Sequence, residues 1–331
     1  WLSPTTGGDS CAKAMRQHIR FMKDQMPSDL PPRETLSSSF VISHLLACSM
    51  LWGSSFLFIK LIDNSLSPLA IAACRGVIGG CALSLWFMVT GRSPLPRRVE
   101  YRHWLILGTF NGWLPNILVA FALTLLASGK AAMIGAAGPL ITSVLAHLVF
   151  TDEKLGRRRF IGVITGFAGM LMLVGSRAME GGATLLAVLA MSGVTLCYSI
   201  GNIYTKTIKD IAPSRLALGQ QVVSGLVATV LVLSLEGSGA FAPVWNNIGL
   251  LLLLGVVSTA IPMTIFMKLI SKAGPARAAM TGYLVPTWAT ILGAIVLDER
   301  LTTLEIAGGV VVLIGVYVVS ATQPAKTSLP P

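Results

Sequence analysis

The chain has 331 residues, of which 53% are apolar and only 12% are charged, about half the roughly 25% found in an average soluble domain. So few charges cannot cover a water-facing surface, which excludes a disordered chain, a disulfide-stapled secreted module and most soluble enzymes. The net charge of +11 is compatible with nucleic-acid binding, but the basic residues are distributed as membrane topology requires, so no nucleic-acid partner is expected.

Residues 1–38 differ in composition from the rest of the chain. They carry four basic residues between positions 13 and 23 at roughly helical spacing, followed by a Pro-rich stretch over 27–32. No apolar segment follows the charged start, so the pattern does not predict a cleaved signal peptide. A basic surface helix over 11–26 is one interpretation, and we favour the other, a cytoplasmic N-terminal tail.

From residue 39 onward the chain is almost continuously apolar. A transmembrane helix needs about 20 mainly apolar residues, and turn and charge signals such as Asp63-Asn64-Ser65 separate windows of this length. The windows predict ten transmembrane helices, at 39–62, 68–89, 104–124, 129–150, 158–175, 183–205, 214–235, 247–270, 275–297 and 303–321. The expected fold class is therefore an all-α polytopic membrane protein, in which 322–331 form a cytoplasmic C-terminal tail.

Lys and Arg are unevenly distributed between the two ends of these predicted helices. If the N-terminus is inside the cell, 20 of the 25 basic residues lie in cytoplasmic segments and only Lys60, Lys130, Arg177 and Arg300 lie outside, while Arg75 lies within a helix. An excess of positive charge marks the cytoplasmic side of a membrane protein. We therefore predict a multi-pass protein of the inner (plasma) membrane with both termini in the cytoplasm.

The chain contains two related halves, 39–175 and 183–321, offset by 145–147 residues. The matching positions are Trp52-to-Lys60 with Tyr198-to-Lys206, Arg75 with Gln220, Pro115 with Pro262, Met133, Gly135 and Pro139 with Met280, Gly282 and Pro286, Asp152-Glu153 with Asp298-Glu299, and Gly162 and Gly169 with Gly308 and Gly315. Each half has five predicted helices, and because five is odd, the second half enters the membrane from the opposite side. Inverted repeats of this kind are known from secondary transporters, whose substrate site lies at the repeat interface.

The same residues carry a family resemblance over about 37–321. They are WGSSF from Trp52, Arg75 in the second helix, and Pro139-to-Glu153 with its repeat Pro286-to-Glu299, each followed by a Gly-rich helix. With this pattern the chain resembles an EamA-type member of the drug/metabolite transporter superfamily. The resemblance implies ten helices in two inverted halves around a central cavity, and small metabolites as substrates. Amino-acid exporters are common in this family, so the resemblance favours an amino acid or a related amphipathic compound.

Polar side chains within the predicted helices are the candidates for a substrate site, because a polar group in a membrane is costly and tends to face a cavity or a partner. The candidates are Trp52, Ser55, Arg75, Asn111, Asn116, His147, Tyr198, Asn202, Gln220, Tyr283 and Trp288. Arg75 either binds a substrate carboxylate or braces carbonyl groups at helix ends, and the family pattern favours bracing. Hydroxyl groups have the alternative of bonding their own backbone, and Tyr and Trp that of anchoring a helix at the interface.

Four prolines within the predicted helices are candidate gating or hinge residues. Pro115 and Pro262 each remove a backbone hydrogen bond and are expected to interrupt their helices, either lining the cavity or making a simple kink. Pro139 and Pro286 lie in segments of small residues and are expected to let their helices bend as gates.

Other charged and small residues have structural interpretations. Lys60 and Lys206 end their predicted helices and are expected to extend their amines to the membrane interface. Glu153 and Glu299 are expected to stabilise the amino ends of the helices that follow them. The Gly-rich helices at 158–175 and 303–321 have almost no polar side chains and are expected to pack at the periphery.

The sequence contains no HExxH motif, no Walker-type phosphate loop, no CxxC pair and no paired carboxylates within a helix, so we expect no enzyme activity, no cofactor and no metal. Any proton coupling would use His44, His147 or the substrate itself. The sequence favours a permease that exports a small metabolite by alternating access, as a monomer or homodimer in contact with membrane lipids. The alternative is an intramembrane enzyme or a lipid-handling membrane protein.

Overall fold

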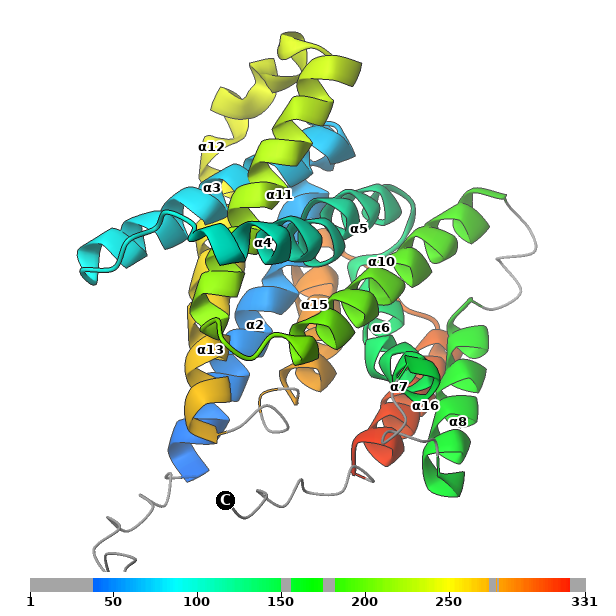
Figure 1. The fold of residues 1–331 in the computed structure, drawn as a ribbon. Coiled ribbons are helices and arrows are strands. Elements are labelled where there is room, and N and C mark those ends of the chain that lie inside the picture. Colours follow the sequence, from blue (N-terminus) through cyan, green and yellow to red (C-terminus); the bar gives the residue numbers. More distant parts are fainter. Residues whose placement is uncertain (1–37, 150–155, 175–181, 274–277, 279, 322–331) are drawn as a thin grey trace, which may run out of the picture. The chain divides into compact units, whose positions relative to one another are not determined.

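The computed structural model describes residues 38–149, 156–174, 182–273, 278 and 280–321, and every regular element within them is helical (Figure 1). An all-α chain is therefore confirmed for the part that the structure describes. The predicted tails lie outside the described residues, apart from Ser38, and so does Glu153.

The helices of the first half are α2 (Ser38–Asp63), α3 (Pro68–Val89), the 3₁₀ turn η1 (Arg98–Glu100), α4 (Tyr101–Gly108), the π-helical segment η2 (Thr109–Trp113), α5 (Leu114–Leu125), α6 (Ser128–Gly135), α7 (Gly138–Val149) and α8 (Arg157–Val174). Those of the second half are α10 (Gly182–Thr207), α11 (Pro213–Leu235), the 3₁₀ segment η3 (Ser238–Asn247), α12 (Ile248–Leu252), the π-helical segment η4 (Leu253–Ala260), α13 (Ile261–Ala273), α15 (Thr281–Leu297) and α16 (Thr303–Ala321).

Seven helical runs in the described part of the chain are long and apolar enough to cross a membrane, which makes this a multi-pass membrane protein. They are Ser39–Asp63, Pro68–Val89, Arg98–Leu125, Ser128–Val149, Leu185–Thr205, Pro213–Leu235 and Ser238–Leu269. Helices α15 and α16 are apolar but shorter, and α8 begins with three consecutive arginines. The three further spans expected from the sequence, at 158–175, 275–297 and 303–321, stay predictions.

Large apolar side chains project outward from the helices. Leu171, Val230 and Ile295 expose 75%, 63% and 76% of their surface. In water, exposing apolar surface costs a free energy of about 25 cal/mol per Å². In a bilayer the lipid tails cover these side chains, so the exposed aliphatic surface agrees with a membrane environment.

Local sequence explains where the helices begin and break. Ser67 accepts a hydrogen bond from the backbone N–H of Ala70 over 3.1 Å, which caps α3, and Pro68 occupies the first turn, where its missing N–H has no partner to lose. Pro115 and Pro262 are each the second residue of the helix that follows a π-helical segment, η2 or η4. A proline crowds the carbonyl four residues earlier, which explains a widened turn before it. The two halves therefore carry the same break at matched positions.

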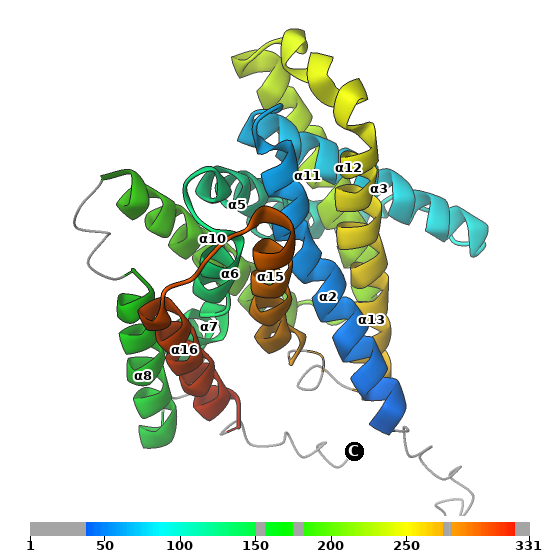
Figure 2. The same ribbon diagram turned by 180° about the vertical axis from the view of Figure 1, so that it is seen from behind.

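Glycines let α8 and α16 approach closely. A methyl group added to Gly162 would lie 2.9 Å from the carbonyl oxygen of Gly315, and one added to Gly169 would lie 2.7 Å from that of Gly308. The two helices lie side by side in both views (Figure 1 and Figure 2). Small residues at such contacts let membrane helices pack backbone against backbone. Gly162 matches Gly308 in the repeat, and Gly169 matches Gly315. Exchanging the two halves therefore turns the Gly162–Gly315 contact into the Gly308–Gly169 contact.

A second pair of contacts has the same reciprocity. Between α2 and α15, a methyl group on Gly53 would lie 2.7 Å from Cβ of Trp288. Between α7 and α10, the hydroxyl groups of Thr142 and Ser199 form a hydrogen bond of 2.9 Å. Gly53 and Ser199 occupy matched positions in the two halves. Thr142 matches Ala289, at the same offset as Pro139 and Pro286, and the backbone nitrogen of Ala289 lies 3.2 Å from the methyl group placed on Gly53. The halves thus contact each other through equivalent surfaces.

Candidate functional site

A group of polar side chains lies where α3, η2, α5, α10, α11 and η4 meet. Its members, here called the central cluster, are Arg75, Asn111, Asn116, Tyr198, Gln220, Gln221, Ser224 and Thr259. Five of the eight are substrate-site residues predicted from the sequence, and the structure adds Gln221, Ser224 and Thr259. The cluster draws side chains from both halves of the chain.

Arg75 connects α3 to the π-helical segment η4. Its Nε–H donates a hydrogen bond to Oγ1 of Thr259 over 3.0 Å, and the Thr259 hydroxyl in turn donates to the carbonyl of Leu254 over 2.7 Å. Tyr198 of α10 lies close enough to Arg75 for an electrostatic interaction. No carboxylate forms an ion pair with Arg75 among the described residues, and Thr259 is the hydrogen-bond partner that they provide. The guanidinium is therefore braced through Nε, while its two terminal nitrogens have no hydrogen bond within the described chain.

Two buried amide oxygens of the cluster lack a hydrogen-bond donor within the described residues: Oδ1 of Asn111 and Oε1 of Gln221. The Asn111 side chain packs against Gly201 of α10, and Gln221, 4% exposed, lies with Thr259 around Gly79 of α3. An unpaired buried polar group costs about 1–3 kcal/mol. Each of these oxygens can accept a hydrogen bond from a donor that reaches it.

Asn116, Gln220 and Ser224 complete the cluster between α5 and α11. Asn116, 4% exposed, donates through Nδ2 to Oγ of Ser224 over 3.4 Å. Gln220 is buried, and a methyl group added to Gly112 of η2 would lie 3.0 Å from the backbone carbonyl oxygen of Gln220. The absence of a side chain at Gly112 thus lets the broken helix lie against α11.

Four predicted residues on α2 and α15 have packing partners instead. The Trp52 ring lies 5.0 Å from that of Phe266, and Ser55 bonds the carbonyl of Trp52 in its own helix over 2.7 Å. Tyr283 donates its hydroxyl proton to the carbonyl of Val316 on α16 over 3.3 Å. Trp288 contacts the backbone of α2 through Gly53.

The remaining predicted residues lie on α10, α7 and at the helix breaks. Asn202 is exposed and lies one helical turn beyond Tyr198, on the same face of α10. His147 is half-buried near the end of α7. Pro115 and Pro262 are buried after their π-helical segments, Pro139 lies in the first turn of α7, and Pro286 is buried inside α15.

Lys60 and Glu299 have different partners from those expected. The Lys60 amine forms an ion pair with Oε1 of Glu299 over 3.5 Å, a protein partner that the sequence does not predict. The other oxygen of Glu299 accepts the backbone N–H of Ser128 over 2.8 Å, at the start of α6 rather than of α16. Glu305 caps α16 instead, accepting the N–H of Thr302 over 2.8 Å. The expectation for Glu299 was wrong, because its partners are far away in the sequence, whereas the position of the Lys60 amine at the interface stays a prediction.

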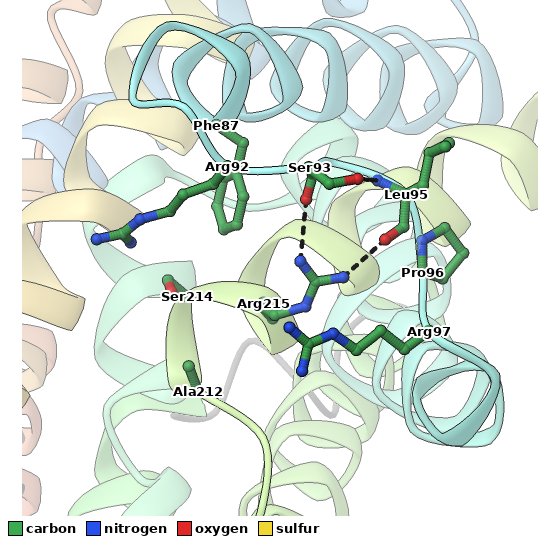
Figure 3. Close-up of a pocket in the computed structure, with 9 residues that line it drawn as sticks. All are labelled: Phe87, Arg92, Ser93, Leu95, Pro96, Arg97, Ala212, Ser214 and Arg215. Atoms are coloured by element: carbon green, nitrogen blue, oxygen red, sulfur yellow. Dashed lines mark hydrogen bonds between the residues drawn. The ribbon is translucent and has the colours of Figure 1, made fainter.

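A separate pocket of about 650 Å³, here called the arginine pocket, lies between the end of α3 and the start of α11 (Figure 3). Its lining residues are Phe87, Arg92, Ser93, Leu95, Pro96, Arg97, Ala212, Ser214 and Arg215. None of these is a predicted site residue, since the arginines were interpreted only as indicators of topology. The pocket is therefore distinct from the central cluster.

Two segments of the chain, 39–175 and 185–321, each match the EamA-like transporter family. The chain is 24% identical to a "Probable amino-acid metabolite efflux pump" of Salmonella typhimurium, over 81% of this chain and 91% of that protein. It is 19% identical to the uncharacterized transporter YoaV of Bacillus subtilis, over 84% of this chain and 95% of that protein. A solved crystal structure shares the fold, with a TM-score of 0.62 at 17% identity over 86% of this chain and 96% of that one.

Proposed function

The chain belongs to the EamA-like transporter family, and from that premise we propose that it is a secondary transporter that exports a small metabolite across the inner membrane by alternating access. The solute class that we propose is an amino acid or a related amphipathic compound, in line with relatives named as amino-acid metabolite efflux pumps. The observation that carries the proposal is the pair of family matches, which cover both halves of a multi-pass membrane chain.

We propose that the two halves are five-helix repeats of opposite orientation, with ten transmembrane helices and both termini in the cytoplasm. The reciprocal contacts of Gly162 with Gly315 and of Gly169 with Gly308 support a two-fold relation between the halves. An odd number of helices in each repeat turns the second copy over, and the excess of basic residues on one side supports the orientation.

We propose the central cluster as the substrate site, because side chains from both repeats meet there. Arg75, held through Nε, offers its two terminal nitrogens to a carboxylate in the bidentate geometry that guanidinium groups favour. The unpaired oxygens of Asn111 and Gln221 accept hydrogen bonds from an ammonium group. One cation and two acceptors complement a zwitterion such as an amino acid.

The four prolines are proposed as hinges of the alternating-access movement. Pro115 and Pro262 follow matched π-helical segments that contribute Asn111 and Thr259 to the cluster, so bending at either break displaces a cluster residue. Pro139 and Pro286 lie on α7 and α15, which contact the first helix of the opposite repeat. Trp288 holds the α2–α15 contact, Tyr283 the α15–α16 contact, and Trp52 the contact of α2 with Phe266 of α13, and the movement occurs against these contacts.

The experiment that tests this function is a solute screen in proteoliposomes. Purified full-length protein is reconstituted, and uptake or release of radiolabelled amino acids, amphipathic metabolites and sugars is compared with protein-free vesicles. Saturable flux of an amino acid or related compound supports the proposal. Folded protein that moves none of these solutes contradicts it and favours an intramembrane enzyme or a lipid-handling protein.

A further inference from the structure

We propose that the arginine pocket binds the headgroup of an anionic phospholipid, with an acyl chain of the same lipid over the shallow apolar groove beside it. The pocket shares no residue with the central cluster, so this inference is independent of the transported solute. It rests on the charge of the pocket, on the adjoining groove and on the position of both at the ends of membrane-spanning helices.

The pocket has three arginines, and one carboxylate, that of Glu100, interacts with two of them. Arg215 is occupied: its guanidinium binds both carboxylate oxygens of Glu100, with Nη2–Oε2 at 2.7 Å, and Glu100 is buried. Arg92 and Arg97 are exposed and form no ion pair among the described residues. In Figure 3 their side chains come from the two ends of the segment that forms one wall of the pocket. Arg97 also interacts electrostatically with Glu100, but three guanidinium groups against one carboxylate leave the concavity positively charged, which favours an anion, and phosphate in particular.

A shallow, mostly apolar depression adjoins the charged pocket and is here called the apolar groove; it encloses only about 10 Å³, so an acyl chain would lie over it and not within it. It is lined by Leu83, Trp86, Phe87, Ser214, Ala217, Met263, Thr264 and Met267. Phe87 and Ser214 line both the groove and the pocket, so the two surfaces are continuous. The Arg92 guanidinium lies 5.9 Å from the centroid of the Trp86 ring, at the boundary between them. A charged site joined to an apolar groove matches a phosphate headgroup joined to a hydrocarbon chain.

The position in the fold selects a lipid rather than a soluble anion. Val89 ends one membrane-spanning helix and Pro213 begins another, so the pocket lies at the level where lipid phosphates lie. Basic pockets between membrane helices are known binding sites for anionic headgroups. A free anion would leave this apolar surface uncovered.

The pocket is held open before a ligand binds. Arg215 donates Nη1–H to the carbonyl of Ser93 over 2.9 Å and Nη2–H to that of Leu95 over 2.7 Å (Figure 3). These bonds fix the connection between Arg92 and Arg97 against the start of α11. A site that is already ordered loses less conformational freedom on binding.

The test titrates purified full-length protein with phosphatidylglycerol or phosphatidylcholine and counts bound lipids by native mass spectrometry. We expect phosphatidylglycerol to bind at least about tenfold more tightly than phosphatidylcholine. Arg92→Gln/Arg97→Gln should weaken phosphatidylglycerol binding by about 30-fold, as two lost interfacial cations imply. The control Arg98→Gln/Arg158→Gln removes the same charge from exposed residues outside the pocket and should change binding less than about threefold.

A fluorescence experiment locates the acyl chain. Phosphatidylglycerol with brominated chains should quench part of the tryptophan emission, and Trp86→Phe should remove that part while the lipid still binds. Equal binding of the two lipids, equal loss in the pocket and control variants, or quenching unchanged by Trp86→Phe would each overturn the proposal. So would glycerol phosphate binding as tightly as phosphatidylglycerol, since the site would then be one for soluble anions.

Discussion

The Nε–H of Arg75 on α3 donates to Oγ1 of Thr259 on η4 over 3.0 Å, and this hydrogen bond joins the first half of the chain to the second. Thr259→Val removes the acceptor and leaves the half-buried Nε–H donor of Arg75 unpaired. We expect the free energy of unfolding to fall by about 1–3 kcal/mol. Thr264→Val, five positions away, is the control, because its hydroxyl bonds only the carbonyl of Ile261 in its own helix. Thermal unfolding in detergent measures both, and equal losses would show that the Arg75 contact contributes nothing.

Gly166 of α8 packs directly against the side chain of Leu140 on α7. Gly166→Leu overpacks this contact and should lower stability by about 1–3 kcal/mol. Gly249→Leu is the control, since no atom lies within 4 Å of a methyl group added there. Both variants are compared by thermal unfolding and by flux per folded molecule. Fully stable Gly166→Leu protein without flux would mean that α8 lines the transport pathway.

The Lys60–Glu299 pair links α2 to the segment between α15 and α16, with side chains 25% and 12% exposed. A double-mutant cycle of Lys60→Met and Glu299→Gln should give a coupling energy of about 0.5–1 kcal/mol. In the Asp298–Arg300 pair the charged atoms lie 3.6 Å apart and the side chains are 84% and 86% exposed. This pair should give a coupling energy near zero in the same assay. Equal coupling in the two pairs would indicate that solvent screens the Lys60 pair as well.

The inverted arrangement predicts which loops face outward. In a variant without native cysteines, single Cys residues at Asn64 and Ser238 should react with a membrane-impermeant thiol reagent added to intact cells. Cys at Ser93 or Gly156 should react only after the membrane is permeabilised. Reversal within either pair would refute the inverted repeat, and would not be explained by a shifted helix boundary.

Much of the helical order follows from the sequence, because lipid imposes strong constraints on composition. Pro115 and Pro262 indicate the two breaks, since proline cannot continue the backbone hydrogen-bond pattern. Arg75, Asn111 and Asn116 are visible as candidates because amides and charges within apolar windows are rare. These signals are local, so the sequence alone is enough to find them.

The rest of the site depends on contacts across the fold. Thr259 and Ser224 are hydroxyl residues on apolar helices, which usually bond their own backbone, so only the structure reveals Arg75 and Asn116 as their partners. Glu299 meets Lys60 only once the first and last parts of the chain have packed together. Arg215 is one of the basic residues from which we predict the orientation in the membrane, but counting charges carries no information on its bond to Glu100.

The central claim, transport through the central cluster, is tested most directly by solute counterflow in proteoliposomes. Vesicles loaded with an unlabelled solute identified in the screen should accumulate the labelled form. Asn111→Ala should lower this accumulation about tenfold or more, because it removes a side-chain oxygen that would accept a hydrogen bond from a charged solute. Thermal stability should not change, because this buried oxygen has no hydrogen-bond partner among the described residues. Asn247→Ala, which removes only a bond to the Pro243 carbonyl, should leave counterflow unchanged. Folded wild-type protein without counterflow, or equal rates for Asn111→Ala and wild type, would contradict the account.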